Sequence, residues 1–310
     1  MFNFIKILCY LVLCINLHAE EAGTDFQARS LNSNVDILDL ESNNIYSNSW
    51  AVIIGINDYD YIEDLNFAVQ DAEDIQKLLL DKFQFKEDHI KLLINEDASL
   101  TNIKSTLFEV ANKTKENDRL LIFYAGHGET IDISEGGELG YLLPVDGKKD
   151  NLYATSLSMR EIKDATSIAK AKHVLLLIDA CYSGLMAVGS KNISSQVGGY
   201  LKKITTARTR QIITAGSRGE IAIEKSEWGH SAFTKNLLTG LSDGLADIDY
   251  DGFITGDELG SYLKKQVSID SDNIQTPQKG KLTNEEGEFI FFVNHDQNKT
   301  PQNELNSEPN

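Results

Sequence analysis

The chain has 310 residues, of which 41% are hydrophobic and only four are proline, a composition that fits one large globular domain with short appendages. Asp and Glu outnumber Lys and Arg by 47 to 29, which gives a formal net charge of −18. This charge excludes nucleic acid and anionic membrane surfaces as expected partners and favours cationic ones.

The N-terminal residues 1–19 have the pattern of a secretory signal peptide. Lys6 precedes an apolar run from Ile7 to Leu17, and Ala19 provides a small residue at the expected cleavage point. Because this run is short for a membrane span, we expect export to the periplasm or the medium, with no membrane span after cleavage. Retention of the segment as an N-terminal anchor is the alternative.

The three cysteines are Cys9, Cys14 and Cys181. The first two lie inside the N-terminal segment, so its cleavage would leave Cys181 alone and preclude an intramolecular disulfide. An unpaired thiol in an exported protein is either a buried, inert side chain or a reactive group. The cysteine count leaves both alternatives open.

Apolar runs alternate with helical periods between two polar flanks, 20–47 and 295–310, which we expect to be disordered. The expected strands are WAVIIGI (50–56), IKLLI (90–94), RLLIFYA (119–125), HVLLLID (173–179), RQIITAG (210–216) and GEFIFFV (287–293). The expected helices span residues 65–83, 103–115, 159–169, 231–241 and 257–267. This order predicts an α/β fold, a three-layer α-β-α sandwich with a mostly parallel sheet of about six strands.

Two chemically reactive side chains directly follow two of these strands. His127 lies between Gly126 and Gly128 after the third strand, and Cys181 follows the fourth. Consecutive strands of a βαβ unit are usually neighbours, so we expect both residues at the carboxyl edge of the sheet, where ligands bind. An imidazole can activate a thiol for acyl transfer, and the N–H groups of Gly128 and Cys181 are candidates for an oxyanion hole.

These residues and their surroundings resemble the caspase-like cysteine peptidases, more specifically the bacterial caspase-domain proteins related to metacaspases. The resemblance covers about residues 48–293 and rests on AVIIGINDYDYIEDLNFAVQDAEDIQKLL, FYAGHGE, LLIDACYSG and HSAFTKNLLTGL. The separation of 54 residues between His127 and Cys181 agrees with the value of about 50 in caspases. The resemblance implies a His127–Cys181 catalytic dyad that hydrolyses peptide bonds without an organic cofactor. A non-catalytic binding or calcium-sensing module with the same fold is the alternative.

The resemblance also implies a substrate preference. Asp179 stands where caspases carry glutamine, which resembles metacaspases instead. An acid two residues before the nucleophile can face the pocket for the substrate residue that precedes the cut. We therefore expect cleavage of polypeptides after Arg or Lys, with Asp179 and Asp64 as charge partners.

By the same resemblance, residues 48–185 form a large-subunit-like part and residues 210–294 a small-subunit-like part of the peptidase domain, with 186–209 as linker. The stretch 183–209 is rich in Gly, Ser, Thr and Lys, and we expect a loop. The candidate sites of self-cleavage are the basic residues in this stretch and directly after it, namely Lys191, Lys202, Lys203, Arg208 and Arg210. A solvated loop that is not processed is the alternative.

The stretch DIDYDGFITGDE, residues 247–258, fits the twelve-residue calcium loop of an EF-hand. The expected ligands are Asp247, Asp249, Asp251, Phe253 through its carbonyl oxygen, and Glu258. We expect this loop to bind calcium, and calcium to regulate the protein. The alternative is an acidic loop that only caps the following helix.

Overall fold

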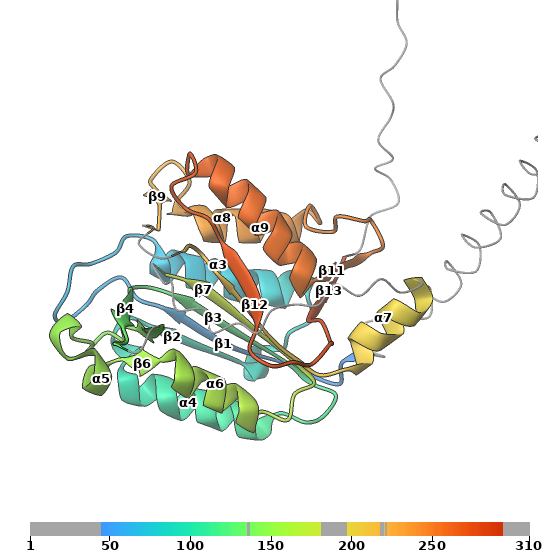
Figure 1. Ribbon diagram of the computed structural model, residues 1–310, viewed down its shortest axis with the longest axis horizontal. Coiled ribbons are helices and arrows are strands. Elements are labelled where there is room, and N and C mark those ends of the chain that lie inside the picture. The colour runs from blue at the N-terminus through green and yellow to red at the C-terminus, as the bar shows by residue number, and fades with distance from the viewer. Residues whose placement is uncertain (1–44, 135–136, 181–196, 218–219, 221, 294–310) are drawn as a thin grey trace, which may run out of the picture.

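A six-stranded sheet forms the centre of the computed structural model, which describes residues 45–293 except 135–136, 181–196, 218–219 and 221 (Figure 1). In spatial order its strands are β12 (Gln278–Lys281), β8 (Thr209–Thr214), β7 (His173–Asp179), β3 (Arg119–Ala125), β1 (Ser49–Gly55) and β2 (Ile90–Ile94). Neighbours from β8 to β2 run parallel, and only β12 is antiparallel to its neighbour. The predicted, mostly parallel sheet is confirmed.

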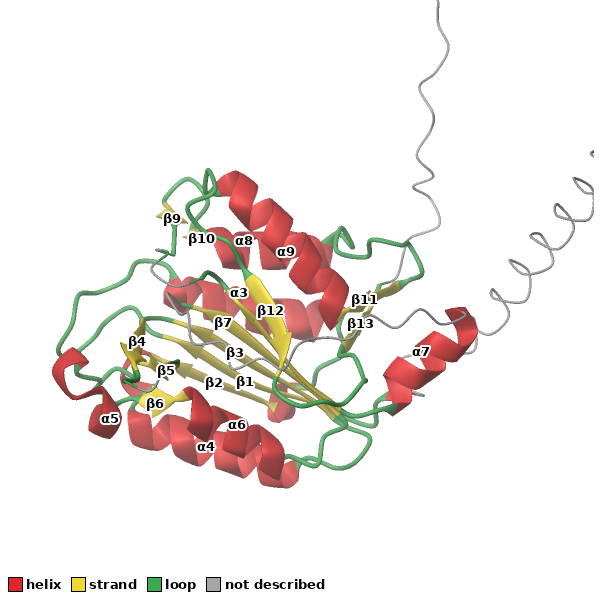
Figure 2. Ribbon diagram, viewed as in Figure 1, coloured by secondary structure: helices red, strands yellow, loops and turns green. Residues whose placement is uncertain are grey.

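Helices cover both faces of this sheet (Figures 1 and 2). One face carries α3 (Ala68–Lys82), α8 (Ala232–Ser242) and α9 (Gly256–Asp270), and the other carries α4 (Leu100–Lys113) and α6 (Met159–Ile168). Successive residues of the central strands alternate between the two apolar cores, with Phe123 in one and Ile122 and Tyr124 in the other. This alternation makes β3 and β7 nearly continuous apolar runs, and the three-layer sandwich is confirmed.

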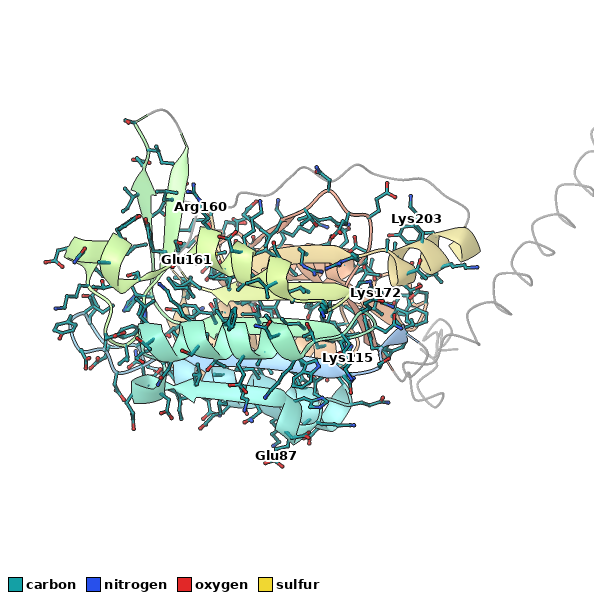
Figure 3. The ribbon with its side chains drawn as sticks, turned by 90° about the horizontal axis from the view of Figure 1, so that it is seen from below. Glu87, Lys115, Arg160, Glu161, Lys172 and Lys203 are labelled. Carbon is teal, nitrogen blue, oxygen red and sulfur yellow. The ribbon has the colours of Figure 1, made fainter. Side chains whose placement is uncertain are left out.

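The helices α4 and α6 lie side by side across one face, as Figure 3 shows from below. The hydroxyls of Ser99 and Ser158 cap their first turns, and Glu161 completes a capping box with Ser158. Lys104 of α4 forms an ion pair with Glu161 at 2.7 Å, which joins the two helices. Capping residues thus set the starts of both helices, close to the carboxyl edge of the sheet.

Short strands and one short helix lie outside the central sheet. The short strands are β4 (Gly128–Asp132), β5 (Glu138–Leu142), β6 (Leu157–Ser158), β9 (Glu224–Lys225), β10 (His230–Ser231), β11 (Phe253–Thr255) and β13 (Ile290–Phe292), and α5 spans Leu152–Thr155. The strand expected near the C-terminus is present as β13, but it pairs with β11 and does not join the central sheet.

The expected loop at 183–209 contains a helix, α7 (Val197–Thr206), which corrects that prediction. Two glycines and two threonines among its ten residues lower helix propensity and hide the short apolar pattern. Leu201 and Ile204 are buried in a cluster with Ile45 and Tyr46. The packed domain therefore also begins slightly before residue 48.

Within the described ranges, no helix combines the length and the apolar character needed to cross a membrane. The predicted signal peptide at 1–19, with Cys9 and Cys14, lies outside the described residues, as do most of the two flanks. Export and flank disorder therefore stay predictions.

Candidate active site

A backbone hydrogen bond joins the carboxyl ends of β3 and β7. Ala125 lies opposite Asp179 in the parallel register, and the N–H of Gly126 donates to the carbonyl oxygen of Asp179 at 3.2 Å. His127 follows Gly126 directly, and Cys181 is the second residue after Asp179. The two strands are neighbours, as predicted, whereas Cys181 itself lies outside the described residues.

Three contacts hold His127 in addition to a backbone hydrogen bond from Leu143. Its N–H donates to the hydroxyl of Tyr59 at 2.8 Å, and its carbonyl oxygen accepts from the hydroxyl of Tyr124 at 2.8 Å. The third contact joins its Nε2 to the carbonyl oxygen of Glu63 at 2.8 Å. Because a carbonyl oxygen can only accept, this contact places a hydrogen on Nε2 and leaves Nδ1 of the neutral ring as an acceptor.

Gly126 has no space for a side chain. A Cβ atom at this position would lie 2.6 Å from the hydroxyl oxygens of both Tyr59 and Tyr124. These two hydroxyls hold the backbone of His127. The glycine is therefore required by the packing that supports the histidine.

Gly128 opens β4 opposite Leu142 of β5. The N–H of Leu143 donates to the carbonyl oxygen of His127 at 3.0 Å, so His127 and Leu143 form a hydrogen-bonded pair. Such pairs alternate with non-hydrogen-bonded pairs in antiparallel sheets, which makes the Gly128–Leu142 pair a non-hydrogen-bonded one. The N–H of Gly128 consequently points away from β5.

Asp179 is buried at the end of β7, with a relative exposure of 4%. Its Oδ2 accepts hydrogen bonds from the hydroxyls of Ser231 and Thr234, the latter at 2.6 Å. Its Oδ1 is buried and has no hydrogen-bond partner among the described residues. Burial, with the nearby negative charge of Asp71, raises the pKa of Asp179. Oδ1 is therefore an acceptor that a cationic group would satisfy.

Asp71 of α3 is the acidic neighbour of Asp179, and the sequence analysis missed it. Ser231 links the two carboxylates, because its N–H donates to Asp71 Oδ2 at 3.4 Å and its hydroxyl donates to Asp179. Asp71 is also buried, and burial raises its pKa. A carboxylate at helical spacing from the buried residues Ala68 and Ile75 was the available signal.

Asp64 is not part of this acidic pair. Its side chain is exposed, and its Oδ1 accepts the N–H of Tyr59 at 3.0 Å. Asp64 thereby braces the loop between β1 and α3 that supplies Tyr59 and Glu63 to His127. Asp71, not Asp64, is the acid that lies beside Asp179, and a role of Asp64 in substrate binding stays a prediction.

The candidate self-cleavage residues differ in accessibility. Arg210 is buried in β8, where its guanidinium donates to the carbonyl oxygens of Thr166 and Ala169 at 2.9 Å. Lys202 and Lys203 lie on α7, and Lys191 lies outside the described residues. Arg210 is therefore inaccessible in the folded chain, which corrects its expected role.

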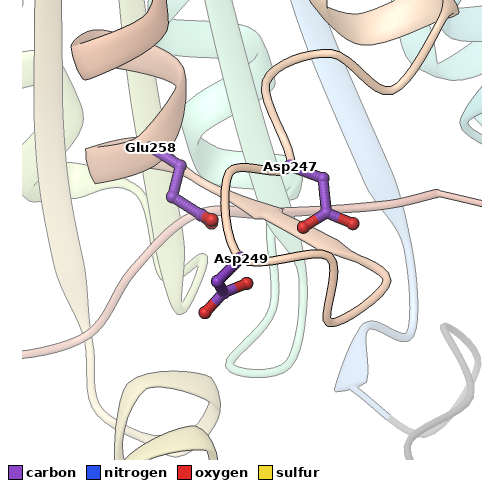
Figure 4. Close-up of side chains that lie close together, drawn as sticks. All are labelled: Asp247, Asp249 and Glu258. Carbon is purple, nitrogen blue, oxygen red and sulfur yellow. The ribbon is translucent and has the colours of Figure 1, made fainter. Parts of the chain in front are cut away.

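The acidic loop 247–258 brings together three of the four expected carboxylate ligands (Figure 4). Asp247, Asp249 and Glu258 each offer a carboxylate oxygen, and these oxygens lie within 4.8 Å of one another. Asp251 is not in this group, because its Oδ1 accepts the N–H of Phe253 at 2.9 Å. Burial raises the pKa of Asp251 to about 7, and the negative charges of Asp249, Asp247 and Glu258 add to this increase.

The elements around this loop match an EF-hand only in part. β11 covers loop positions 7–9 and pairs with β13, and α9 begins at position 10. The preceding helix α8 ends at Ser242, so residues 243–246 separate it from the loop. The departing helix fits the expected helix–loop–helix arrangement, whereas the entering helix is offset.

Known proteins resemble the chain over most of the described region. A family model for the caspase domain matches residues 48–277. Metacaspase-6 of Arabidopsis thaliana is 25% identical over 241 residues, which cover 73% of this chain and 63% of that protein. Metacaspase-7 of the same plant is 37% identical over 93 residues, covering 28% of this chain and 23% of that protein. The chain thus spans less than two thirds of the length of these relatives.

A solved structure supports the fold. The crystal structure of protein GSU0716 from Geobacter sulfurreducens has a TM-score of 0.53 to this chain at 17% sequence identity. The match covers 76% of this chain and 93% of that protein. At this identity the likeness shows the α/β sandwich alone.

Proposed function

Because this chain belongs to the caspase-domain family, we propose that it is a cysteine endopeptidase with His127 as general base and Cys181 as nucleophile. One observation carries the proposal: the hydrogen bond from Gly126 to Asp179 joins the two strand ends that lead into these residues. Strand ends that lead into a histidine and a cysteine at one edge of the sheet, in a family of peptidases, favour this function over the non-catalytic module.

The contacts of His127 support its role in the reaction. The Glu63 carbonyl keeps a hydrogen on Nε2, so Nδ1 takes the thiol proton of Cys181, and the thiolate attacks the carbonyl carbon of the scissile bond. The protonated imidazole then gives its proton to the leaving amine, and water hydrolyses the thioester. The outward N–H of Gly128, together with that of Cys181, stabilises the oxyanion.

The acidic pair Asp71 and Asp179 supports a preference for Arg or Lys before the cut. A cationic substrate side chain would supply the partner that Asp179 Oδ1 lacks. An acidic side chain would instead meet two buried carboxylates, and such like-charge contacts cost several kcal/mol. The specificity proposed here therefore differs from that of a peptidase that cuts after Asp.

Fluorogenic peptides that end in Arg, Lys or Asp test the function and the preference together. We expect the mature chain to cleave the Arg and Lys peptides at least about a hundredfold more efficiently than the Asp peptide, because of the like-charge penalty. Absence of turnover by folded protein would favour the non-catalytic binding module. The intact mass of the same active sample tests self-cleavage before α7, at Lys191.

Calcium is the cofactor that we propose for the loop 247–258. Asp247, Asp249 and Glu258 supply the clustered oxygens that this hard cation prefers. The loop leads into α9, which packs on α8, and the N-cap of α8 is Ser231, a partner of Asp179. Calcium would thereby regulate activity by ordering the elements behind the substrate pocket.

Calcium titration followed by calorimetry and by thermal unfolding tests this site. We expect Asp249→Asn to weaken calcium affinity by about tenfold or more, because affinity depends on the number of ligand charges. Asp249 is exposed, so the fold should tolerate the change. Asp243→Asn, an exposed acid outside the loop, is the matched control. A wild-type chain with neither binding heat nor a shift in Tm at millimolar calcium would contradict the proposal.

A further inference from the structure

The acidic pair is accompanied by a histidine that the sequence analysis did not single out. His230 lies in β10 next to Ser231, and its Nδ1 is 2.7 Å from Oδ1 of Asp71. Its Nε2 is 3.6 Å from Oδ2 of Asp74. Asp71 is thus shared: one oxygen contacts the imidazole, and the other accepts from the residue that also binds Asp179.

The charges that act on this imidazole and its partner come from three elements. They are Asp71 and Asp74 on α3, Asp179 at the end of β7, and Glu224 on β9. Lys225 lies opposite His230 in the β9–β10 pair, but its ammonium group stacks on Trp228 at 4.2 Å and donates to the carbonyl oxygen of Asp270. The described charges around the imidazole therefore favour its protonated form.

The state of His230 decides how much negative charge the pocket presents. With the imidazole protonated, Asp71 is paired, and Asp179 is the acid left with a free oxygen among the described residues. With the imidazole neutral, both buried carboxylates act on an entering cation. Resting on the proposed function, we propose that His230 is a specificity-determining residue whose imidazolium competes with the basic substrate side chain for Asp71.

The competition of the His230 imidazolium for Asp71 should weaken as the pH rises. The hydrogen bond to Asp71 raises the pKa of His230 above its ordinary value, so the competing cation persists to higher pH than in a free histidine. The competitor is present below that raised pKa and is lost as the pH rises through it. Ionisation of Asp179 also strengthens cation binding as the pH rises. The contribution of His230 is therefore measured by comparing the wild-type chain with His230 variants at each pH.

Binding of benzamidine, a monocationic mimic of arginine, measured by calorimetry between pH 5.5 and 8.5, tests the inference without requiring turnover. We expect His230→Asn to bind about tenfold more tightly than wild type at pH 6 and equally at pH 8.5, since it carries no charge. We expect His230→Lys, with a permanent charge, to bind about tenfold more weakly than wild type at pH 8.5. KM for the Arg peptide should follow the same order.

The outcomes separate the two proposals. The same pH dependence in wild type and His230→Asn would overturn the inference, as would the absence of benzamidine binding in all three proteins. If benzamidine binding differs as expected but no protein cleaves the peptides, the peptidase proposal fails and the inference stands. His230→Gln replaces the Asn variant if that variant loses its thermal unfolding transition.

Discussion

Replacing Cys181 by alanine is expected to abolish hydrolysis of the Arg peptide, and His127→Ala is expected to lower kcat/KM by about 10²–10⁴-fold. Alanine at 181 removes the atom that forms the thioester, so no step of the reaction can begin. Alanine at 127 leaves the thiol but removes the group that takes its proton. Initial rates over a range of enzyme concentrations measure both losses, with thermal unfolding to confirm the fold.

Two further variants locate the effect at the strand ends. Tyr59→Phe keeps the ring beside His127 but removes the hydroxyl that accepts its N–H, so a partial loss of about tenfold is expected. His89→Ala is the matched control, because this histidine stacks on Trp50 and precedes the start of β2, at the opposite edge of the sheet. Undiminished activity in Cys181→Ala would show that another group is the nucleophile.

The parts of the fold that the sequence predicted are those set by local pattern. β3 and β7 are buried on both faces, so each appears as an unbroken apolar run, and this places His127 and Cys181 after strands. β12 has the sequence QKGK and lies at the sheet edge, where polar residues are tolerated. Its pairing with β8 depends on the tertiary fold, and no pattern in four polar residues could predict it.

The proposed substrate pocket was harder to predict because its contacts join residues that lie far apart in the chain. Asp179 could be proposed from its position beside the nucleophile, whereas Asp71 and His230 are 159 residues apart and meet only when α3 packs beside β10. Asp64 was proposed from the resemblance to metacaspases, and Asp71 was not singled out. The side chains of Ser231 and Thr234 complete the pocket through the capping turn of α8.

Asp179→Asn is expected to lower kcat/KM for the Arg and Lys peptides by at least about thirtyfold, mainly through KM, because removal of a buried charge partner costs about 2–5 kcal/mol. Asparagine has nearly the same shape, and its side-chain oxygen can still accept from Ser231 and Thr234. The amide carries no charge, so the loss measures the attraction between Asp179 and the substrate cation. Asp243→Asn is the matched control, since Asp243 is exposed and lies at the C-terminal end of α8.

The same substitution is expected to leave stability unchanged or to raise it at pH 8. Burial raises the folded-state pKa of Asp179 above its unfolded value, so ionisation of this carboxyl destabilises the folded protein as the pH rises through that interval. Asn removes the cost of ionising a buried carboxyl. The Tm of Asp179→Asn relative to wild type should therefore be higher at pH 8 than at pH 5. If Asp179→Asn loses activity without losing stability, the carboxylate of Asp179 serves substrate binding and does not stabilise the fold. Normal cleavage of Arg peptides by Asp179→Asn, or loss of the basic preference in Asp64→Asn, would instead place the recognition of the substrate cation elsewhere.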